Sequence, residues 1–424
     1  MKLVISNANI YGEKVADIEI SDGVITKIAE ANTLKSDIDV KGMIALPGLV
    51  DLHTHLREPG REDSETVATG TAAAARGGFT AVHAMANTTP VADNAGVVEQ
   101  IYRLGQESGL CDVFPVGAVT QGLEGTALAE LGAMADSKAR VRVFSDDGKC
   151  VHDPVLMRRA LEYVKAFDGC VAQHAQEPKL TIDSQMNEGE VSSILGLRGW
   201  PKVAEEAIIA RDVLLAEHVG ARLHICHLST AGSVEIIRWA KSRGINVTAE
   251  VTPHHLILTD ESARTYDPVY KVNPPLRTQE DVAALRAALA DGTIDIVATD
   301  HAPHPSEDKE CEWSAAAFGM VGLETALQIV NTVMVATGLI GWRDVARVMS
   351  STPAQIGRLD NHGNEIAEGQ VANLTFIDPN YAGKVDRNQT ASKSRNNPFH
   401  GMELKGRVGL TILRGQETYK AEWL

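Results

Sequence analysis

The sequence has no Cys-x-x-Cys pair, no apolar run long enough to cross a bilayer and no excess of positive charge. Its five cysteines are scattered along the chain, a pattern typical of reduced, buried thiols, and we expect a cytoplasmic protein. A membrane-spanning helix would need about 20 consecutive apolar residues, so no membrane partner is expected. Residues 1–7 have a short strand pattern and lack the features of a signal peptide.

The charge balance is acidic. Lys and Arg total 40 against 56 Asp and Glu, which gives a formal net charge of −16 at pH 7. Such a surface repels a phosphate backbone, so nucleic acid is excluded as an expected partner. The 424 residues, 44% of them hydrophobic, suffice for one large domain and a smaller one.

The pattern of elements changes along the chain. Residues 1–48 have short strand patterns separated by turns, including the hairpin signal Asp22-Gly23. Short strands and turns return after about residue 358, notably over residues 369–378. We therefore predict that residues 1–48 and 359–424 form one small, discontinuous β-sandwich domain beside a larger domain of residues 49–358.

The larger domain alternates apolar strands with helical patterns, which is typical of a parallel α/β fold. The expected helices include residues 64–77, 201–219 and 231–243. Eight strands followed by helices predict a (β/α)₈ barrel, in which chemistry lies at the carboxyl ends of the strands. The predicted strands are residues 49–55, 79–87, 113–119, 140–147, 170–175, 222–228, 246–253 and 295–301.

The first of these strands ends in His53-Thr54-His55-Leu56-Arg57. Side chains of a strand alternate between its two faces, so His53 and His55 point the same way, and Arg57 shares that parity. Two adjacent imidazoles can bind a metal such as zinc, and a guanidinium can bind a carboxylate through two hydrogen bonds. A lone His-x-His is weak evidence, because two histidines on one face can simply be packed.

Polar residues at the ends of later strands strengthen the hypothesis of a metal site. Taken alone, each is more often an ordinary hydrogen-bonded side chain, but so many at equivalent strand ends form a pattern that favours a binuclear site. The candidate ligands from the strand ends are His53, His55, His174, His227 and Asp300, with a bridging group from the fourth strand.

Four segments carry a specific resemblance to a known family. They are residues 47–60 (PGLVDLHTHLREPG), 249–255 (AEVTPHH), 273–277 (NPPLR) and 298–304 (ATDHAPH). The chain resembles the dihydroorotases of the long, two-domain bacterial type within the amidohydrolase superfamily, and the resemblance covers essentially the whole chain. Two departures from the family pattern replace prolines by Ala86 and Ala317 in its motifs.

The resemblance implies roles for individual residues. It implies that two divalent ions, expected to be Zn²⁺, are bound by His53, His55, Asp147, His174, His227 and Asp300. It implies substrate contacts from Arg57, Asn87, Asn273, His304, Phe318 and Gly319. It gives Asp300 the role of general acid and base toward a bridging hydroxide.

The bridging group on strand four has alternatives. Asp147 takes the place that a carboxylated lysine holds in many amidohydrolases, and Asp146 should point the opposite way. Lys149 shares the parity of Asp147, so a carboxylated Lys149 stays open as an alternative.

The implied reaction is the reversible cyclisation of N-carbamoyl-L-aspartate to L-dihydroorotate in pyrimidine synthesis. One alternative is a hydantoinase or dihydropyrimidinase, which acts on rings without the carboxylate; another is a non-catalytic scaffold subunit for aspartate transcarbamoylase. We expect a homodimer, with an aspartate transcarbamoylase as a candidate partner. The acidic run at residues 307–312 predicts a solvated part of a mobile loop that can close over substrate.

Overall fold

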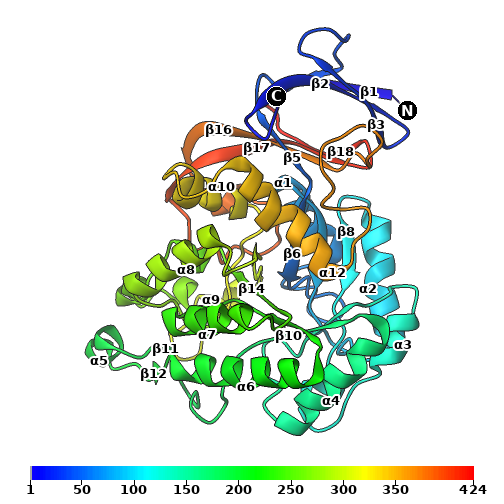
Figure 1. The fold of residues 1–424 in the computed structure, drawn as a ribbon. Helices are drawn as coiled ribbons and strands as arrows, with labels where there is room; N and C mark the ends of the chain where they lie inside the picture. The colour runs from blue at the N-terminus through cyan, green and yellow to red at the C-terminus, as the bar shows by residue number, and fades with distance from the viewer. Residues whose placement is uncertain (1) are drawn as a thin grey trace.

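The computed structural model describes residues 2–424 and contains a terminal sheet built from both ends of the chain. Strands β1 (Lys2–Ile10), β2 (Lys14–Ser21), β3 (Val24–Glu30), β4 (Ile38–Asp39) and β5 (Ile44–Pro47) pair with β16 (Leu374–Lys384), β17 (Glu403–Leu413) and β18 (Gln416–Lys420). The order is β18-β17-β16-β5-β1-β2-β3, with β4 paired to β1. Figure 1 shows both termini at this sheet, which lies beside the rest of the molecule.

The centre of the molecule consists of parallel strands that are buried on both faces and are therefore nearly all apolar. One sheet holds β6 (Leu49–Thr54), β7 (Phe79–Ala84) and β8 (Asp112–Pro115). A second holds β9 (Val143–Phe144), β10 (Cys170–Gln173), β13 (Arg222–Ile225), β14 (Val247–Val251) and β15 (Ile296–Val297). Parallel bridges Gly117↔Phe144 and Thr54↔His301 connect the two sheets at both edges.

Helices follow the parallel strands and cover them from outside (Figure 1). They are α1 (Val67–Arg76), α2 (Ala95–Ser108), α3 (Leu131–Asp136), α4 (Pro154–Val164), α6 (Val203–Val219), α7 (Ala231–Ser242), α8 (Gln279–Asp291), α10 (Ala326–Val330), α11 (Trp342–Ala346) and α12 (Thr352–Gly357). Short insertions add β11 (Met186–Asn187), α5 (Glu190–Leu195), β12 (Gly199–Trp200) and α9 (Ser306–Lys309).

Each predicted parallel strand is present, but most end earlier than predicted. The clearest case is residues 140–147, of which only Val143 and Phe144 form a strand. His227 and Asp300 have positive φ angles of 32° and 46°, which interrupt the extended backbone after β13 and β15. The ligand candidates therefore lie in turns directly after the strands.

The predicted helices are also present; α7 begins at Ala231 as predicted, and two others begin later than predicted. The helix expected at residues 64–77 begins at Val67, because the side chain of Thr66 accepts a hydrogen bond from the Thr69 backbone and caps it. Helix α6 begins at Val203 and ends at Val219, and it is capped by Gly220, whose φ of 68° suits a glycine at that position. Within residues 2–424 the structure has no helix that is both long and apolar enough to cross a membrane.

Candidate metal centre

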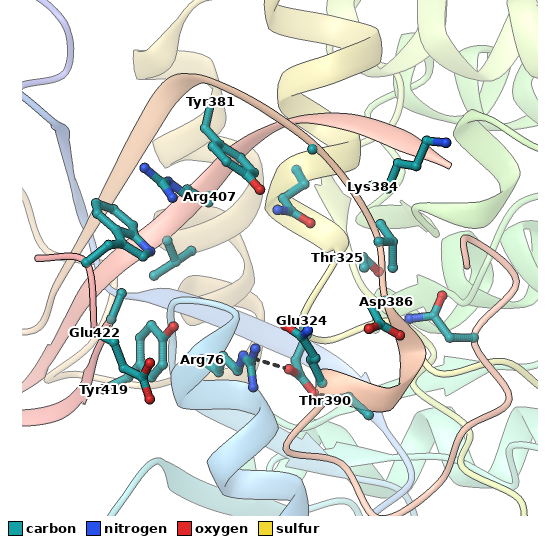
Figure 2. Close-up of a pocket in the computed structure, with 18 of the residues that line it drawn as sticks. Arg76, Glu324, Thr325, Tyr381, Lys384, Asp386, Thr390, Arg407, Tyr419 and Glu422 are labelled. Atoms are coloured by element: carbon teal, nitrogen blue, oxygen red, sulfur yellow. Dashed lines mark hydrogen bonds and ion pairs between the residues drawn. The ribbon is translucent and has the colours of Figure 1, made fainter. Parts of the chain in front are cut away.

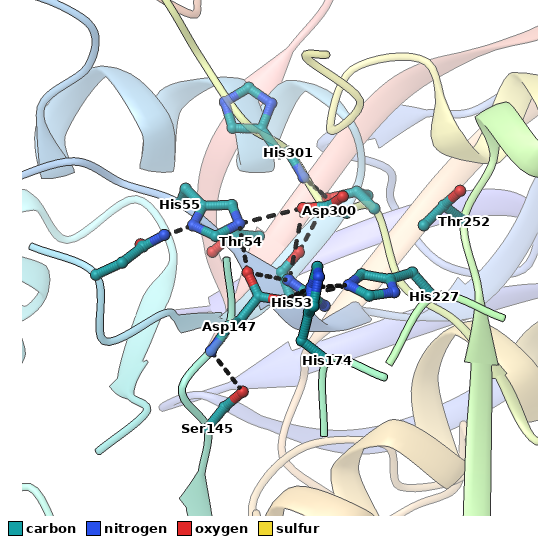
Figure 3. A network of polar contacts seen from close by, with 12 residues as sticks. His53, Thr54, His55, Ser145, Asp147, His174, His227, Thr252, Asp300 and His301 are labelled. Carbon is teal, nitrogen blue, oxygen red and sulfur yellow. Dashed lines mark hydrogen bonds and ion pairs between the residues drawn. The ribbon is translucent and has the colours of Figure 1, made fainter. Parts of the chain in front are cut away.

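The ends of five parallel strands bring six side chains into one buried cluster (Figure 3). All six are nearly inaccessible to solvent, with Asp300 the most exposed at 5%. The cluster consists of His53 on β6, His55 directly after β6, Asp147 after β9, His174 after β10, His227 after β13 and Asp300 after β15.

One half of the cluster joins His53 and His55 to two carboxylates. His55 Nε2 lies 3.2 Å from Asp147 Oδ2 and 3.1 Å from Asp300 Oδ1. His53 Nε2 lies 3.3 Å and 3.5 Å from the same two oxygens. Ligands about 2.1 Å from one tetrahedral zinc ion would lie about 3.4 Å from each other, so these separations suit a common cation.

The other half of the cluster uses the second oxygen of Asp147. His174 Nδ1 and His227 Nε2 each lie 3.2 Å from Asp147 Oδ1, and 2.9 Å from each other. Asp147 is thus the member that the two halves share, with Oδ2 toward one and Oδ1 toward the other. This is the arrangement required of a bridging carboxylate.

The carboxylates of the cluster favour a positive charge among them. Burial opposes protonation of His53, yet Asp147, Glu250 and Asp300 outweigh it and hold the His53 pKa well above its ordinary value. His53 Nε2 has no hydrogen-bond partner within residues 2–424, although it is buried and faces two carboxylates. Buried polar atoms normally have a partner, so the donor set fits a bound divalent cation.

Side chains around the cluster orient its histidines. His53 Nδ1 donates to Glu250 Oε1 over 2.6 Å, and His55 Nδ1 donates to Asn87 Oδ1 over 2.9 Å. These hydrogen bonds place the protons on Nδ1 and leave Nε2 of both rings free to bind an ion. Glu250 was not predicted as a functional residue, although it stands in the motif at residues 249–255.

Glu250 also contacts other histidines. Its Oε1 accepts from the His227 backbone N–H at 3.1 Å, and its Oε2 lies 3.0 Å from His224 Nε2. The thiol of Cys226 lies close to His53 and Glu250, but burial raises its pKa, so it stays protonated. Glu250 therefore ties β13 and β14 to the histidine of β6.

His174 has a different outer partner. Its Nε2 donates to Gln176 Oε1 over 2.8 Å, which leaves Nδ1 toward the cluster. The same Gln176 oxygen accepts from Asn273 Nδ2 over 3.1 Å. Gln176 was not predicted as a site residue, and it connects a cluster histidine to a residue expected to contact substrate.

Asp146, Asp147 and Lys149, the candidates for the bridging group, have different surroundings in the structure. Asp146 turns away from the cluster and accepts hydrogen bonds from the backbone N–H groups of Val119 and Thr120 at 2.8 and 2.9 Å. Lys149 is exposed and is not part of the cluster. Among these three residues, Asp147 is the one whose side chain lies in the cluster.

Several of the residues expected to contact substrate lie next to one another. Arg57 Nε donates to the Pro303 carbonyl over 3.1 Å, and its Nη2 lies 3.4 Å from His304 Nε2. His304 Nε2 donates to the carbonyl of Phe318 over 2.8 Å. Arg57 and His304 are thus neighbours, and Phe318 fixes the imidazole ring.

The other expected substrate contacts have mixed surroundings. Asn87 Oδ1 is occupied by His55, so the structure gives Asn87 a part in orienting a cluster histidine. Asn273 Oδ1 is buried without a partner among the described residues. Gly319 has a φ of 140°, and a Cβ there would lie 2.8 Å from His304 Nε2, so a larger residue would displace that ring.

A terminal-domain residue also reaches the loop after β15. Asn396 Nδ2 donates to the carbonyls of Ala302 and Gly319, at 2.9 and 3.2 Å, and its Oδ1 accepts from His304 N over 3.2 Å. The prediction that residues 307–312 are a solvated stretch is wrong for Lys309, whose side chain is buried.

Comparison with known proteins gives a consistent relationship. A family model described as dihydro-orotase-like matches residues 42–233. The chain is 68% identical to a dihydroorotase of Streptomyces coelicolor over 98% of both chains. It is 54% identical to a dihydroorotase of Mycobacterium tuberculosis over 99% of this chain and 98% of that one.

The chain belongs to the dihydroorotase family. Among solved structures it is similar to an L-hydantoinase (dihydropyrimidinase) from Arthrobacter aurescens, with a TM-score of 0.86, 25% identity and coverage of 99% of this chain and 96% of that one. A dihydropyrimidinase from Brevibacillus agri shares the fold with a TM-score of 0.85 and 22% identity, over 99% of this chain and 95% of that one. The fold is therefore the α/β type of the cyclic amidohydrolases.

A separate cavity of about 780 Å³ lies between the terminal sheet and the ends of α1 and α10 (Figure 2). The ion pair from Arg76 to Glu324, 3.1 Å long, lies in it. Glu324 also accepts from the Ala391 and Ser392 backbones, at 2.9 and 3.2 Å. These contacts fasten the terminal domain to the parallel core, and the cavity contains none of the predicted site residues.

Proposed function

We propose that this member of the dihydroorotase family catalyses the reversible cyclisation of N-carbamoyl-L-aspartate to L-dihydroorotate in pyrimidine synthesis. The observation that carries the proposal is the Arg57 guanidinium beside His304, two residues after the cluster histidine His55. A cation clamp next to the cluster matches a substrate ring that bears a carboxylate. The acidic protein thus offers its anionic substrate a local positive site.

We further propose two metal sites, with Zn²⁺ as the expected ion. His53, His55, Asp147 and Asp300 would hold one, and Asp147, His174 and His227 the other. When bound, such ions polarise an amide carbonyl and lower the pKa of a water molecule between them. Support comes from the two oxygens of Asp147, each of which faces two histidines.

The protein's own side chains have distinct tasks in this proposal. Burial favours the protonated form of Asp300, but His53 and His55 outweigh it and hold the Asp300 pKa below its ordinary value. Asp300 therefore begins as a carboxylate, can accept a proton from the attacking water and can deliver it to the leaving ring nitrogen. Glu250 and Asn87 keep the cluster histidines oriented during this transfer.

In this proposal, residues beside the cluster orient the substrate. Arg57 and His304 would hold the exocyclic carboxylate, with Phe318 and Gly319 forming the adjoining wall. The unpaired Asn273 Oδ1 is suited to accept a hydrogen bond from a ring N–H. Fixing both the carboxylate and a ring nitrogen limits rotation of the ring before reaction.

We also infer that the two parallel sheets, joined by their edge bridges, form a closed (β/α)₈ barrel over residues 49–358. Residues 1–48 and 359–424 would then be the separate domain. The sandwich arrangement of that domain stays a prediction, as do the homodimer, the aspartate transcarbamoylase partner and the cytoplasmic location.

A hydantoinase or dihydropyrimidinase is the alternative that the fold neighbours favour. Arg57 argues against it, because a ring without a carboxylate leaves this guanidinium without an ionic partner. The exposed Lys149 argues against a carboxylated-lysine bridge. A purely structural subunit is disfavoured because the candidate ligands all converge in one cluster.

Purified protein should be assayed with dihydroorotate, hydantoin and dihydrouracil, alongside elemental analysis. We expect dihydroorotate to be the preferred substrate and more than one equivalent of divalent metal per chain. Preference for an uncharged ring would favour the hydantoinase alternative. Full activity in a metal-free protein would contradict both metal sites.

A further inference from the structure

Lys309 is a buried cation in the loop between β15 and α10. Its side chain is 5% exposed, and its Nζ donates to the carbonyls of Lys271, Ala317 and Gly319 at 3.1, 2.9 and 3.0 Å. An ammonium has three N–H donors, and each has an acceptor here. Lys309 therefore joins the loop at residues 303–319 to the segment that begins at residue 271.

Lys271 makes the reciprocal connection. It is 2% exposed, and its Nζ donates to the carbonyls of Trp313 and Ser314 at 2.7 and 3.2 Å. Its ammonium also lies 4.5 Å from the centre of the Phe318 ring, within the range of a cation–π contact. Each segment thus inserts a lysine among the backbone carbonyls of the other.

These two segments carry most of the proposed substrate contacts. His304, Phe318 and Gly319 lie on the loop, and Asn273 lies two residues after Lys271. The Gly319 N–H donates to the Lys271 carbonyl at 3.0 Å, which is the same oxygen that Lys309 binds. Movement of that carbonyl would shift Gly319, and the carbonyl of Phe318 that fixes His304 would follow.

The ammonium of Lys309 is costly to bury. Among residues 2–424 its ammonium has backbone carbonyls as partners and no ion pair with a carboxylate, and burial, then Lys271, lowers the Lys309 pKa to about 7. An unbranched apolar side chain would fill similar space without this penalty. Unlike an apolar side chain, the ammonium holds three backbone carbonyls in place by donating a hydrogen bond to each.

We infer that Lys309 is a positioning residue. It sets the distance between Asn273 and the surface formed by His304, Phe318 and Gly319, and thereby how well the carboxylate of the substrate ring fits. This inference rests on the proposed function, in which His304, Phe318 and Gly319 help to bind the carboxylate of the substrate. Lys309 itself reaches backbone carbonyls and has no part in the chemical step.

The test compares Lys309→Met, Lys309→Gln and the matched control Lys179→Met, which removes an exposed lysine. For Lys309→Met we expect KM for dihydroorotate to rise about 10- to 100-fold, with kcat within about threefold of wild type and metal content unchanged. Lys309→Gln keeps two N–H donors and should recover part of the loss. Hydrogen exchange should increase in residues 303–319 and 271–274 only in the two Lys309 variants.

Each outcome decides the inference. A selective rise in KM together with faster loop exchange supports it. A lower melting temperature with unchanged KM in both Lys309 variants would reduce Lys309 to a structural role and overturn it. If Lys309→Met does not fold, KM and loop exchange in Lys309→Gln decide by the same criteria. Wild-type protein that turns over only uncharged rings would instead contradict the proposed function, while the exchange data would still report on the contacts of Lys309.

Discussion

His53 and Glu250 are joined by a hydrogen bond of 2.6 Å between Nδ1 and Oε1. A carboxylate can only accept, so this contact fixes the proton of the imidazole on Nδ1 and aims Nε2 at Asp147 and Asp300. The bond connects β6 to β14 across the interior of the parallel core. Glu250, which binds no ion in our proposal, therefore orients His53, which does.

We predict that Glu250→Ala lowers metal affinity by about 10- to 100-fold, the usual effect of losing an outer hydrogen-bond partner of a ligand histidine. Titration of metal-stripped protein against a competing chelator measures this directly. Glu217→Gln, at an exposed carboxylate paired with Arg243, is the control. Unchanged affinity in a folded Glu250→Ala protein would refute the role of Glu250.

The shared carboxylate gives a second prediction. Asp147→Ala should lose metal from both sites, because the cations would then face each other without a carboxylate between them. Elemental analysis should fall from more than one equivalent to below one. Lys149→Ala should keep metal and activity. If Lys149→Ala loses metal while Asp147→Ala keeps it, the bridging group would instead be a carboxylated Lys149.

Asp146→Ala tests the neighbouring carboxylate. It should keep the metal but lower stability by about 1–3 kcal/mol for each backbone N–H of Val119 and Thr120 left unpaired. Thermal unfolding of the metal-loaded protein provides the measurement. A loss of metal as severe as in Asp147→Ala would show that Asp146 also supports metal binding and that side-chain alternation does not identify the bridging aspartate.

The alternation of side chains predicted part of this site from the sequence alone. His53 lies on β6 and His55 directly follows its last residue, so the alternation along this strand accounts for their common direction. The same reasoning favours Asp147 over Asp146, even though β9 ends at Phe144. It overestimated the strand lengths, because the turns with positive φ at His227 and Asp300 depend on local bonding that a hydrophobic pattern does not encode.

Contacts between distant segments were not predictable in this way. Glu250 lies within a recognised motif, but its hydrogen bond to His53 depends on how β14 and β6 meet inside the core. Lys309 lies among acidic residues, which is typical of solvated loops. Its burial results from the folding of that loop onto residue 271, which brings three carbonyls around one ammonium.

Asp212 provides a pH-dependent prediction outside the cluster. Burial raises the pKa of this carboxyl to about 6, against opposing effects of Arg211 and Gln173. Between the ordinary Asp pKa and 6 the folded state binds a proton that the unfolded state releases, so this group lowers stability as pH rises through that window. The shift corresponds to about 3 kcal/mol. Denaturant unfolding at pH 4–7 should show a smaller decrease for Asp212→Asn than for wild type; parallel curves would contradict the raised pKa.

Arg57→Met tests substrate recognition most directly. Removing one partner of a buried, hydrogen-bonded charge pair costs about 2–5 kcal/mol, so we expect kcat/KM for dihydroorotate to fall by that amount of transition-state stabilisation. Metal content should not change, because Arg57 contacts Pro303 and His304 and none of the proposed ligands. Any activity on dihydrouracil should be much less affected, since that ring has no carboxylate for Arg57 to bind. Arg61→Met is the matched control, because Arg61 is also an arginine of this loop but pairs with the exposed Asp308. Normal dihydroorotate turnover by Arg57→Met would place the carboxylate elsewhere in the site.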